Sequence, residues 1–414
     1  MVTWFGLAAL VSVCAIHLFV DVRLWGTRAT PGVALMGGYT LIAGIYAVVS
    51  LFYRVKVIGP FVYVLLVAFG LFSILVSVVT CYMVSWRKHM LNLTTTMANA
   101  KLRPALIVTI LIYIALALPK VLGSGGLWSG ESNEGMATGL VGHFHVILSF
   151  MVVWYACGTC DRGFIKGLLY VTAVFALTFY PVKGWILIPA FAITFAEVQK
   201  EDKKGATLRP LIVMGITGVL LFFGFYLSRQ MTAGDVSIDL LAAQFKPVFE
   251  HFLIYLIAGF FGLDAVVDGL KLPGGLEVIF APLINLYSVF SGDAYVNIIS
   301  GNFNQGFYDM EASGNVYSML GSLVGYAGFY MGIIIALFFL GGTYLVFGLS
   351  LRLRSSALWA ASLYLTAIFA FGWFEFYFWH LRPYEILLFA LLGLFFEQQG
   401  RRSFGVVKSS NEIL

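Results

Sequence analysis

The sequence predicts an all-α protein that crosses a membrane about eleven times and carries one long polar interval late in the chain. Sixty per cent of its 414 residues are hydrophobic and only 11% are charged, and the mean hydropathy is +0.92. A soluble domain of this length does not have such a composition. Apolar stretches close to the roughly 20 residues that a helix needs to cross a bilayer recur along the chain.

These apolar stretches divide the chain into successive expected helices. Between ten and twelve spans fit the pattern. The sixth and seventh are short and are joined by a connection that begins with Pro181. Because proline shapes a tight corner, we expect these two helices to meet at one face of the membrane. The eleven expected spans are residues 2–20, 32–53, 59–85, 104–119, 138–157, 164–180, 185–198, 210–228, 331–350, 357–377 and 384–398.

The distribution of lysine and arginine indicates which side of the membrane each connection faces. With the N-terminus outside and the C-terminus inside, 17 of the 25 lysines and arginines fall on the cytoplasmic side, as the bias against translocating them requires. Arg54 and Lys56, in a short outer turn, are exceptions. The chain then divides into N-terminal membrane helices (1–228), an extracytoplasmic loop (229–314), C-terminal membrane helices (315–398) and a cytoplasmic tail (399–414).

The loop at 229–314 is acidic, with nine carboxylates and only three fixed cations, Arg229, Lys246 and Lys271. An apolar run at 251–263 lies within it, so we expect the loop to form helices of its own. Long loops with internal structure are commonly lids or binding platforms. We therefore expect this loop to hold part of a functional site.

Few cationic side chains lie at the expected outer ends of the membrane helices. Lys183 lies in the corner between two spans, where an ammonium is costly unless an anion or a water-filled cavity compensates it. His380 and Arg382 lie in the last outer turn among aromatic residues, a combination that can clamp a diphosphate and an adjacent sugar. Snorkelling to the interface and an aromatic belt with basic anchors are the structural alternatives.

Proton-accepting side chains of the loop are candidates for general-base catalysis. Glu250 and His251 are adjacent, and either can point into a cavity. Asp264 and Asp268 are one turn apart and can share one face of a helix. Such paired carboxylates bind a metal or activate a hydroxyl, but more often they solvate the end of a helix.

The sequence carries no cofactor fingerprint, nucleophile elbow or metal-ligand spacing. The spacing of His143 and His145 is too weak a signal to indicate a metal site. Near the outer end of a span, however, these two histidines can line a cavity. No phosphate-cradling glycine loop appears on the cytoplasmic side, so we expect no chemistry driven directly by a nucleotide. The four cysteines lie in or at the ends of apolar stretches, and we expect no disulfide framework.

Residues 313–320, with the sequence Ser-Gly-Asn-Val-Tyr-Ser-Met-Leu, precede a glycine-rich stretch at 325–332 and an apolar helix. This succession resembles a segment of the Wzy-type oligosaccharide repeat-unit polymerases. The corner at 180–185 is similar to the place where these proteins carry an outward-facing arginine, although the lysine of this chain loses the bidentate geometry. The apolar run at 251–268 is similar to a loop helix of the family. The resemblance in topology covers the whole chain, and the motifs cover about a quarter of it.

The resemblance implies a membrane-embedded, GT-C-like glycosyltransferase that uses neither metal nor cofactor. Such an enzyme moves a growing glycan from undecaprenyl diphosphate to the non-reducing end of a repeat unit that is also carried on undecaprenyl diphosphate. The reaction takes place at the outer face of the bacterial inner membrane. The expected partners are this donor, this acceptor and the bilayer, without nucleic acid, and whether a chain-length regulator also binds stays open.

The same resemblance suggests roles for the candidate residues. Lys183 and Arg382 would stabilise the departing diphosphate. A carboxylate or histidine of the loop would take the acceptor proton. The residues expected to bind substrate are Lys183, Arg382, His380, Tyr317 and Arg229, and those expected to act in catalysis are Glu250, His251 and Asp264. Aromatic residues of the loop, including Tyr287 and Tyr295, would stack on sugars or pack the core of a lid.

Two other functions remain alternatives. The O-antigen ligases share the same plan and hand a finished glycan to another acceptor, although an acidic outer loop is poorly suited to an anionic lipopolysaccharide core. A transporter or flippase for a lipid-linked sugar would predict charged residues at mid-membrane and internal symmetry. The charged residues identified in the sequence cluster at the ends of spans, which favours the enzyme.

Overall fold

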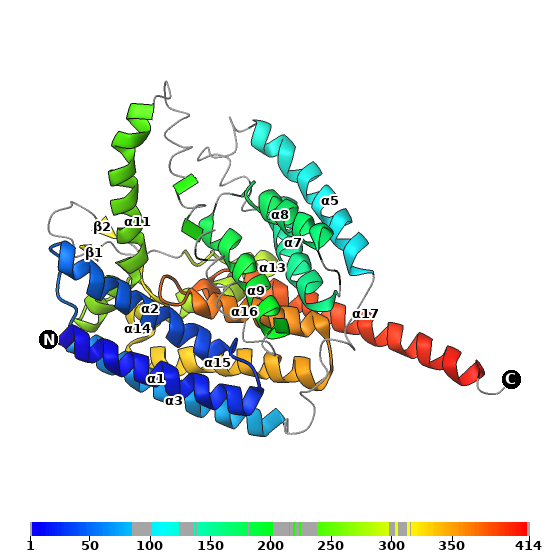
Figure 1. The fold of residues 1–414 in the computed structure, drawn as a ribbon, viewed down its shortest axis with the longest axis horizontal. Coiled ribbons are helices and arrows are strands. Elements are labelled where there is room, and N and C mark those ends of the chain that lie inside the picture. Colours follow the sequence, from blue (N-terminus) through cyan, green and yellow to red (C-terminus); the bar gives the residue numbers. More distant parts are fainter. Residues whose placement is uncertain are drawn as a thin grey trace. The chain divides into compact units, whose positions relative to one another are not determined.

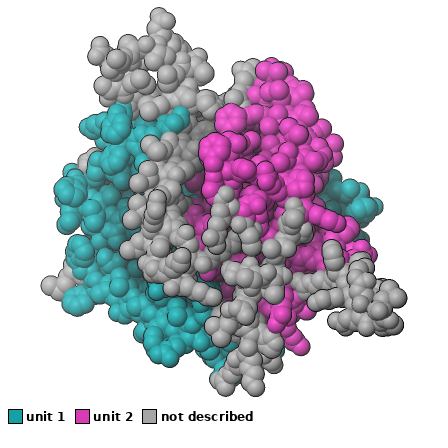
Figure 2. All heavy atoms as spheres, turned by 45° about the vertical axis from the view of Figure 1, so that its right-hand side comes forward, with its two compact units in different colours: residues 1–83, 211–344, 366–381 teal, residues 84–210, 345–365, 382–414 magenta. Residues whose placement is uncertain are grey.

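The computed structural model describes residues 2–84, 101–123, 136, 139–159, 161, 163–180, 182–201, 215, 218, 219, 223, 224, 238–297, 303, 304, 313, 314 and 316–411 (Figure 1). The described part is almost entirely helical, and the chain forms two compact units (Figure 2). Unit 1 comprises residues 1–83, 211–344 and 366–381. Unit 2 comprises residues 84–210, 345–365 and 382–414.

Unit 1 holds the first three helices and the helices of the interval expected to be a loop. The first two helices, α1 and α2, pack against each other (Figure 1). The short strands β1 and β2 pair antiparallel, with Phe303 opposite Gly314. The elements of unit 1 are α1 (Val2–Trp25), α2 (Pro31–Phe52), α3 (Pro60–Val84), α11 (Ile238–Val267), α12 (Leu276–Ile279), α13 (Ala281–Ser291), β1 (Phe303–Asn304), β2 (Ser313–Gly314), α14 (Met319–Ala327) and η3 (Tyr377–Trp379).

Unit 2 holds the middle helices and the C-terminal helix. Two further helices, α15 (Phe329–Arg352) and α16 (Ser356–Ala370), are divided between the units, because residues up to Tyr344 and from Thr366 belong to unit 1. The elements that lie in unit 2 are α5 (Leu102–Gly123), α7 (Gly139–Gly158), α8 (Phe164–Leu177), α9 (Lys183–Glu201) and α17 (Arg382–Asn411).

Within the described residues, seven helices are long and apolar enough to cross a membrane. Three shorter apolar helices are Phe164–Leu177, Gly184–Gln199 and Ser356–Ala370. The chain is therefore a polytopic helical membrane protein, as the composition predicts. The seven longer stretches are Thr3–Trp25, Pro31–Phe52, Pro60–Val84, Leu102–Gly123, Gly139–Gly158, Phe245–Val267 and Phe329–Arg352.

Most of the expected helices are present, with one addition. The stretch Phe245–Val267 has the length and composition of a span although it lies inside the expected loop. Helices α8 and α9 flank the expected corner, of which Pro181 itself lies outside the described residues. The expected span at 210–228 lies largely outside the described residues.

A buried carboxylate joins four helices of unit 1. Asp21 of α1 is fully buried and accepts hydrogen bonds from the hydroxyls of Thr30, Ser77 and Tyr344. The Ser77 hydroxyl in turn accepts from Trp25 Nε1 at 2.9 Å. Its own hydrogen is therefore directed at Asp21. Buried charges persist when hydrogen bonds satisfy them in this way, so this cluster fixes the ends of α1, α2, α3 and α15 to one another.

Close approach of the backbone completes this cluster. The backbone N–H of Gly32 donates to the Tyr344 hydroxyl at 3.1 Å, and the Nδ1 atom of buried His17 lies 3.3 Å from an Asp21 oxygen. A Cβ at Gly32 would lie 2.3 Å from a ring carbon of His17 and 2.6 Å from the Tyr344 hydroxyl. A side chain at this position would therefore separate the helices.

A half-buried carboxylate sets the position of α17 in unit 2. Glu397 of α17 accepts hydrogen bonds from the backbone N–H of Ala357, at 3.1 Å, and from the Ser356 hydroxyl. It thereby supplies an acceptor for a backbone N–H in the first turn of α16, where such donors lack partners within the helix. The same hydroxyl accepts from Trp154 Nε1 of α7 at 2.8 Å. At Gly393, one turn earlier, a Cβ would lie 2.6 Å from the Ala357 Cβ. These contacts hold α17 close to α7.

Candidate anion-binding site

The corner between α8 and α9 places two aromatic rings in unit 2. Helix α8 ends at Leu177, and the N–H of Tyr180 bonds the Leu177 carbonyl at 3.2 Å. The N–H of Val182 then bonds the Tyr180 carbonyl, and the N–H of Trp185 bonds the Val182 carbonyl. This succession of tight turns presents Tyr180 and Trp185 to the same neighbour, Arg382.

Arg382, the first residue of α17, is buried between these rings. Its guanidinium carbon lies 4.6 Å from the ring centroid of Tyr180 and 4.6 Å from that of Trp185. Only 9% of the residue is exposed, and among the described residues it is the only lysine or arginine that is buried. Ring faces attract a cation, most strongly where water is excluded, but they supply no compensating negative charge.

His145 of α7 supplies the one hydrogen-bond acceptor that the described residues offer to Arg382. The guanidinium Nη1 lies 3.0 Å from His145 Nδ1. Because a guanidinium can only donate, Nδ1 accepts this bond and the neutral imidazole carries its proton on Nε2. Tyr113 of α5 packs edge-on against the His145 ring, with centroids 5.6 Å apart. Its buried hydroxyl has no hydrogen-bond partner among the described residues.

The electrostatics of this cluster are those of a buried cation that lacks an anionic partner among the described residues. Burial lowers the pKa of the Arg382 guanidinium, and nearby Tyr180, Tyr364, Tyr113 and Glu385 oppose that shift. An arginine nevertheless stays protonated at neutral pH. Within the described part of the chain no carboxylate lies within ion-pair distance of it. A cation buried without a partner is costly, and an anionic ligand removes that cost.

A histidine and a carboxylate pair at the same end of α17. Glu385 lies one turn after Arg382, and its Oε1 contacts Nδ1 of His143 on α7. The His143 side chain is 53% exposed, whereas Glu385 is only 13% exposed. The first turn of α17 thus contacts both histidines of the Gly-His-Phe-His sequence, and both lie beside the cationic cluster. These two histidines were expected to line a cavity, and their actual neighbours are Glu385 and Arg382.

Lys183 begins α9, two residues before Trp185. Its backbone therefore belongs to the same unit and the same corner as the Arg382 cluster. The Lys183 side chain lies outside the described residues, so the expected contact between this ammonium and a phosphate stays a prediction.

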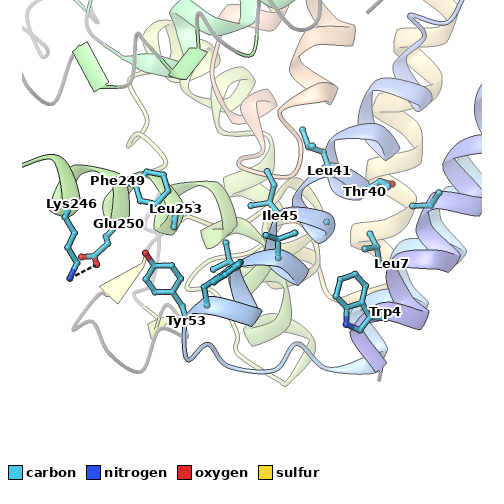
Figure 3. Close-up of a pocket in the computed structure, with 15 residues that line it drawn as sticks. Trp4, Leu7, Thr40, Leu41, Ile45, Tyr53, Lys246, Phe249, Glu250 and Leu253 are labelled. Carbon is cyan, nitrogen blue, oxygen red and sulfur yellow. Dashed lines mark ion pairs between the residues drawn. The ribbon is translucent and has the colours of Figure 1, made fainter.

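The expected catalytic residues belong to unit 1. Glu250 lines a groove of about 1100 Å³ between α1, α2 and α11 (Figure 3). Its carboxylate lies 3.8 Å from Lys246, whose side chain is 83% exposed. His251 packs against Tyr255, with ring centroids 4.8 Å apart and the ring planes tilted by 59°. The wall of the groove is otherwise mostly apolar, with side chains such as Ile45 and Leu253, so its chemistry suits an apolar chain.

Asp264 is held in a salt bridge of unit 1. It is buried, and its Oδ2 lies 2.7 Å from Lys56 Nζ, while its Oδ1 accepts from the N–H of Gly59 at 2.8 Å. Asp268 lies 3.1 Å from the same ammonium. The two aspartates therefore lie on one face at the end of α11, as their spacing predicted. Lys56, an exception to the bias against lysine and arginine on the outer side, is the counter-ion of both aspartates. It thereby joins α11 to the turn between α2 and α3.

The remaining expected substrate residues have separate surroundings. His380 follows η3 in unit 1, and its Nε2 lies 3.5 Å from Glu375 Oε1. Tyr317 is 1% exposed and packs in the core, where its ring approaches Gly262 of α11. Tyr287 and Tyr295 are exposed, and Arg229 lies outside the described residues.

Sequence reasoning identified Arg382 and expected His143 and His145 to line a cavity, but it did not place any residue beside the guanidinium. His145, Tyr113 and Glu385 come from three different helices. One signal was present, because Arg382 and Glu385 are three residues apart and so share a helix face. Among the described residues no three histidine, cysteine, aspartate or glutamate side chains gather in a way that could hold a metal ion. The arrangement is best suited to binding an anion.

Comparison with known proteins adds one match. A family model with the description "Family of unknown function (DUF6337)" matches residues 43–403. Neither a curated protein nor a solved structure matches the chain.

Proposed function

The chain belongs to the DUF6337 family, and we propose that it is a membrane glycosyltransferase that uses a polyprenyl diphosphate as its leaving group. In this proposal a growing glycan moves from undecaprenyl diphosphate to the non-reducing end of a lipid-linked repeat unit. The observation that carries the proposal is the buried Arg382 guanidinium, which has no carboxylate partner among the described residues.

The chemistry of the cluster fits a diphosphate. A guanidinium offers five N–H donors and binds phosphate oxygens in a bidentate manner. One donor is directed at His145, which leaves several for a ligand. The start of the 30-residue helix α17 adds backbone N–H groups that favour an anion. Negative charge grows on a diphosphate as it departs, so a fixed cation at this place stabilises the transition state.

The proposed location follows from the charge distribution of the sequence. The turn before Arg382 faces outward in the expected topology, where lipid-linked glycans are polymerised in the Wzy-type enzymes. The protein would then act at the outer face of the bacterial inner membrane.

The experiment uses the full chain in lipid nanodiscs. Purified protein is given a polyprenyl-diphosphate-linked repeat unit without nucleotide or metal, and the products are resolved by gel. A ladder of increasing glycan length is expected. Replacing Arg382 with methionine should weaken binding of undecaprenyl diphosphate by about 10- to 100-fold, the size of a lost charge-assisted hydrogen bond.

The matched control is Arg54→Gln, which removes an exposed arginine from the same expected side of the membrane. This variant should keep both the ladder and the affinity. Equal affinity of the Arg382→Met protein and the unchanged protein for undecaprenyl diphosphate would refute the role of Arg382. Absence of any ladder with the unchanged protein would refute the polymerase.

One observation favours a second function. Asp21 and His17 form a fully buried ionisable pair inside a helix of spanning length, and transporters often use such groups. Reconstitution into vesicles separates the two functions. Transbilayer movement of a fluorescent lipid-linked sugar without ladder formation would identify a flippase, whereas a ladder without movement would identify the transferase. A ligase would instead pass the whole glycan to a different acceptor in one step.

A further inference from the structure

The pair formed by His143 and Glu385 lies beside the proposed anion site and has the form of an oriented base. Glu385 contacts Nδ1 of His143. Because an ionised carboxylate only accepts, the neutral imidazole carries its proton on Nδ1 and leaves its lone pair on Nε2. Nε2 has no hydrogen-bond partner among the described residues, and the His143 side chain is 53% exposed. A substrate hydroxyl can therefore reach it.

The neighbouring histidine has the opposite arrangement. His145 is fully buried, and its Nδ1 accepts a bond from Arg382. Its lone pair is therefore occupied, and the ring serves to orient the guanidinium. Two residues apart on α7, one histidine offers a free lone pair and the other does not. Of the two, only His143 can accept a proton from a substrate.

From this geometry we propose that His143 is the general base that takes the proton of the acceptor hydroxyl, and that Glu385 is its positioning residue. This inference rests on the proposed function of the Arg382 site. Arg382 and Glu385 lie one turn apart on α17, so the leaving group and the acceptor would be handled by neighbouring positions of one helix.

The proton and the electrons balance in a single displacement. The acceptor oxygen attacks the anomeric carbon of the donor glycan and forms the new glycosidic bond. The bond between that carbon and the diphosphate oxygen breaks, and the diphosphate leaves with the electron pair, next to Arg382. The hydroxyl proton passes to Nε2 of His143, and the resulting imidazolium is stabilised by Glu385. The proton is later released to the diphosphate or to water.

This assignment differs from the expectation for Glu250, His251 and Asp264. Asp264 is held by Lys56, and its Oδ1 accepts from Gly59. Glu250 faces a mostly apolar groove in the other unit. In contrast, His143 has a carboxylate on one ring nitrogen and an accessible lone pair on the other, which is the arrangement of an activated base.

The test measures turnover and donor binding separately in nanodiscs. His143→Gln should lower kcat by about 10²- to 10⁴-fold while the dissociation constant of undecaprenyl diphosphate stays within twofold. Imidazole added to His143→Ala should restore part of the rate. Glu385→Gln should lower kcat without raising KM for the acceptor, and Glu385→Asp should recover part of that loss. Arg54→Gln again serves as the control.

The outcomes distinguish this inference from the function on which it rests. A ladder formed at the normal rate by His143→Gln would overturn the base and leave the transferase intact. Loss of donor binding together with turnover in His143→Gln would also overturn it, because the residue would then serve binding. If the unchanged protein neither binds undecaprenyl diphosphate nor forms a ladder, the proposed function fails and the inference with it.

Discussion

The clusters around Asp21 in unit 1 and Arg382 in unit 2 both bury a charge, but they differ in how that charge is satisfied. Three hydroxyls donate to Asp21, and the ring of His17 lies beside it. Arg382 has two ring faces and one neutral nitrogen as its neighbours. Among the described residues the carboxylate therefore has hydrogen-bond donors on both of its oxygens, whereas the guanidinium has no carboxylate partner.

This difference separates a structural role from a binding role. Removing a buried charge from a complete network leaves its partners unsatisfied and costs stability. Removing a buried charge that has no partner costs little, because the desolvation penalty disappears with it. The two clusters are therefore expected to respond in opposite ways to the same kind of substitution.

The largest effect on stability is expected at Asp21. In Asp21→Asn the amide cannot accept all the bonds that the carboxylate accepts, and one of its own donors faces the surrounding hydroxyls. Breaking a buried charged network costs about 3–5 kcal/mol, so the melting temperature in detergent should fall markedly. The control is Ser12→Ala on the exposed face of α1, which should change stability by less than about 0.5 kcal/mol. An unchanged melting temperature for Asp21→Asn would place Asp21 with the functional residues.

A smaller effect is expected at Tyr344, within the same cluster. Tyr344→Phe removes one donor to Asp21 and the acceptor of the Gly32 N–H. Leaving two buried groups short of a partner costs about 1–3 kcal/mol. Thermal unfolding of the variant should show a loss between those of Asp21→Asn and Ser12→Ala. A loss as large as that of Asp21→Asn would mean that Tyr344 alone holds the cluster together.

The sequence was sufficient to predict the helices, because each long apolar run is a local property of the chain. It predicted the corner between α8 and α9 and the shared face of Asp264 and Asp268 for the same reason. It did not predict that the stretch Phe245–Val267 has the length and composition of a span, since the surrounding carboxylates led us to assign the whole interval to a loop.

The surroundings of Arg382 could not be predicted, because they depend on which helices pack together. His145, Tyr180 and Trp185 are close to Arg382 only through the packing of α7 and α17 and the corner before α9. Asp21 was missed for a similar reason. It lies just beyond the first expected span, next to Arg23, and reads as the polar end of a helix until Thr30, Ser77 and Tyr344 are placed around it.

At Arg382 the expected change in stability is small and can have either sign. Arg382→Met should alter the free energy of unfolding by no more than about 1 kcal/mol, because hydrophobic replacement of a buried charge is often neutral or stabilising. Undecaprenyl diphosphate at 100 times its dissociation constant should stabilise the unchanged protein by about 2.7 kcal/mol and Arg382→Met much less. Thermal unfolding with and without the lipid measures both values. If Arg382→Met loses several kcal/mol of unfolding free energy without ligand, Arg382 has a structural role like that of Asp21.

The smallest effect is expected at Lys56, which lies between these extremes because it is paired but partly exposed. Partial burial lowers the Lys56 pKa, while Asp264 and Asp268 raise it by more, so that it lies above its ordinary value in the folded protein. The stability from this pair is therefore fully present below the unfolded pKa of about 10.4 and is lost as pH rises through the higher folded pKa. Solvent screens the ammonium, which is 39% exposed, and Asp264 keeps its bond from the Gly59 N–H when the lysine is neutral, so the charge of Lys56 contributes about 1 kcal/mol or less. The difference in melting temperature between the unchanged protein and Lys56→Met should be constant up to about pH 10 and should shrink at higher pH. Lys271→Met, at an exposed lysine of unit 1, should have the same melting temperature as the unchanged protein at every pH.

If the difference at Lys56 persists at pH values well above the folded pKa, the lysine stabilises the fold through packing and not through its charge.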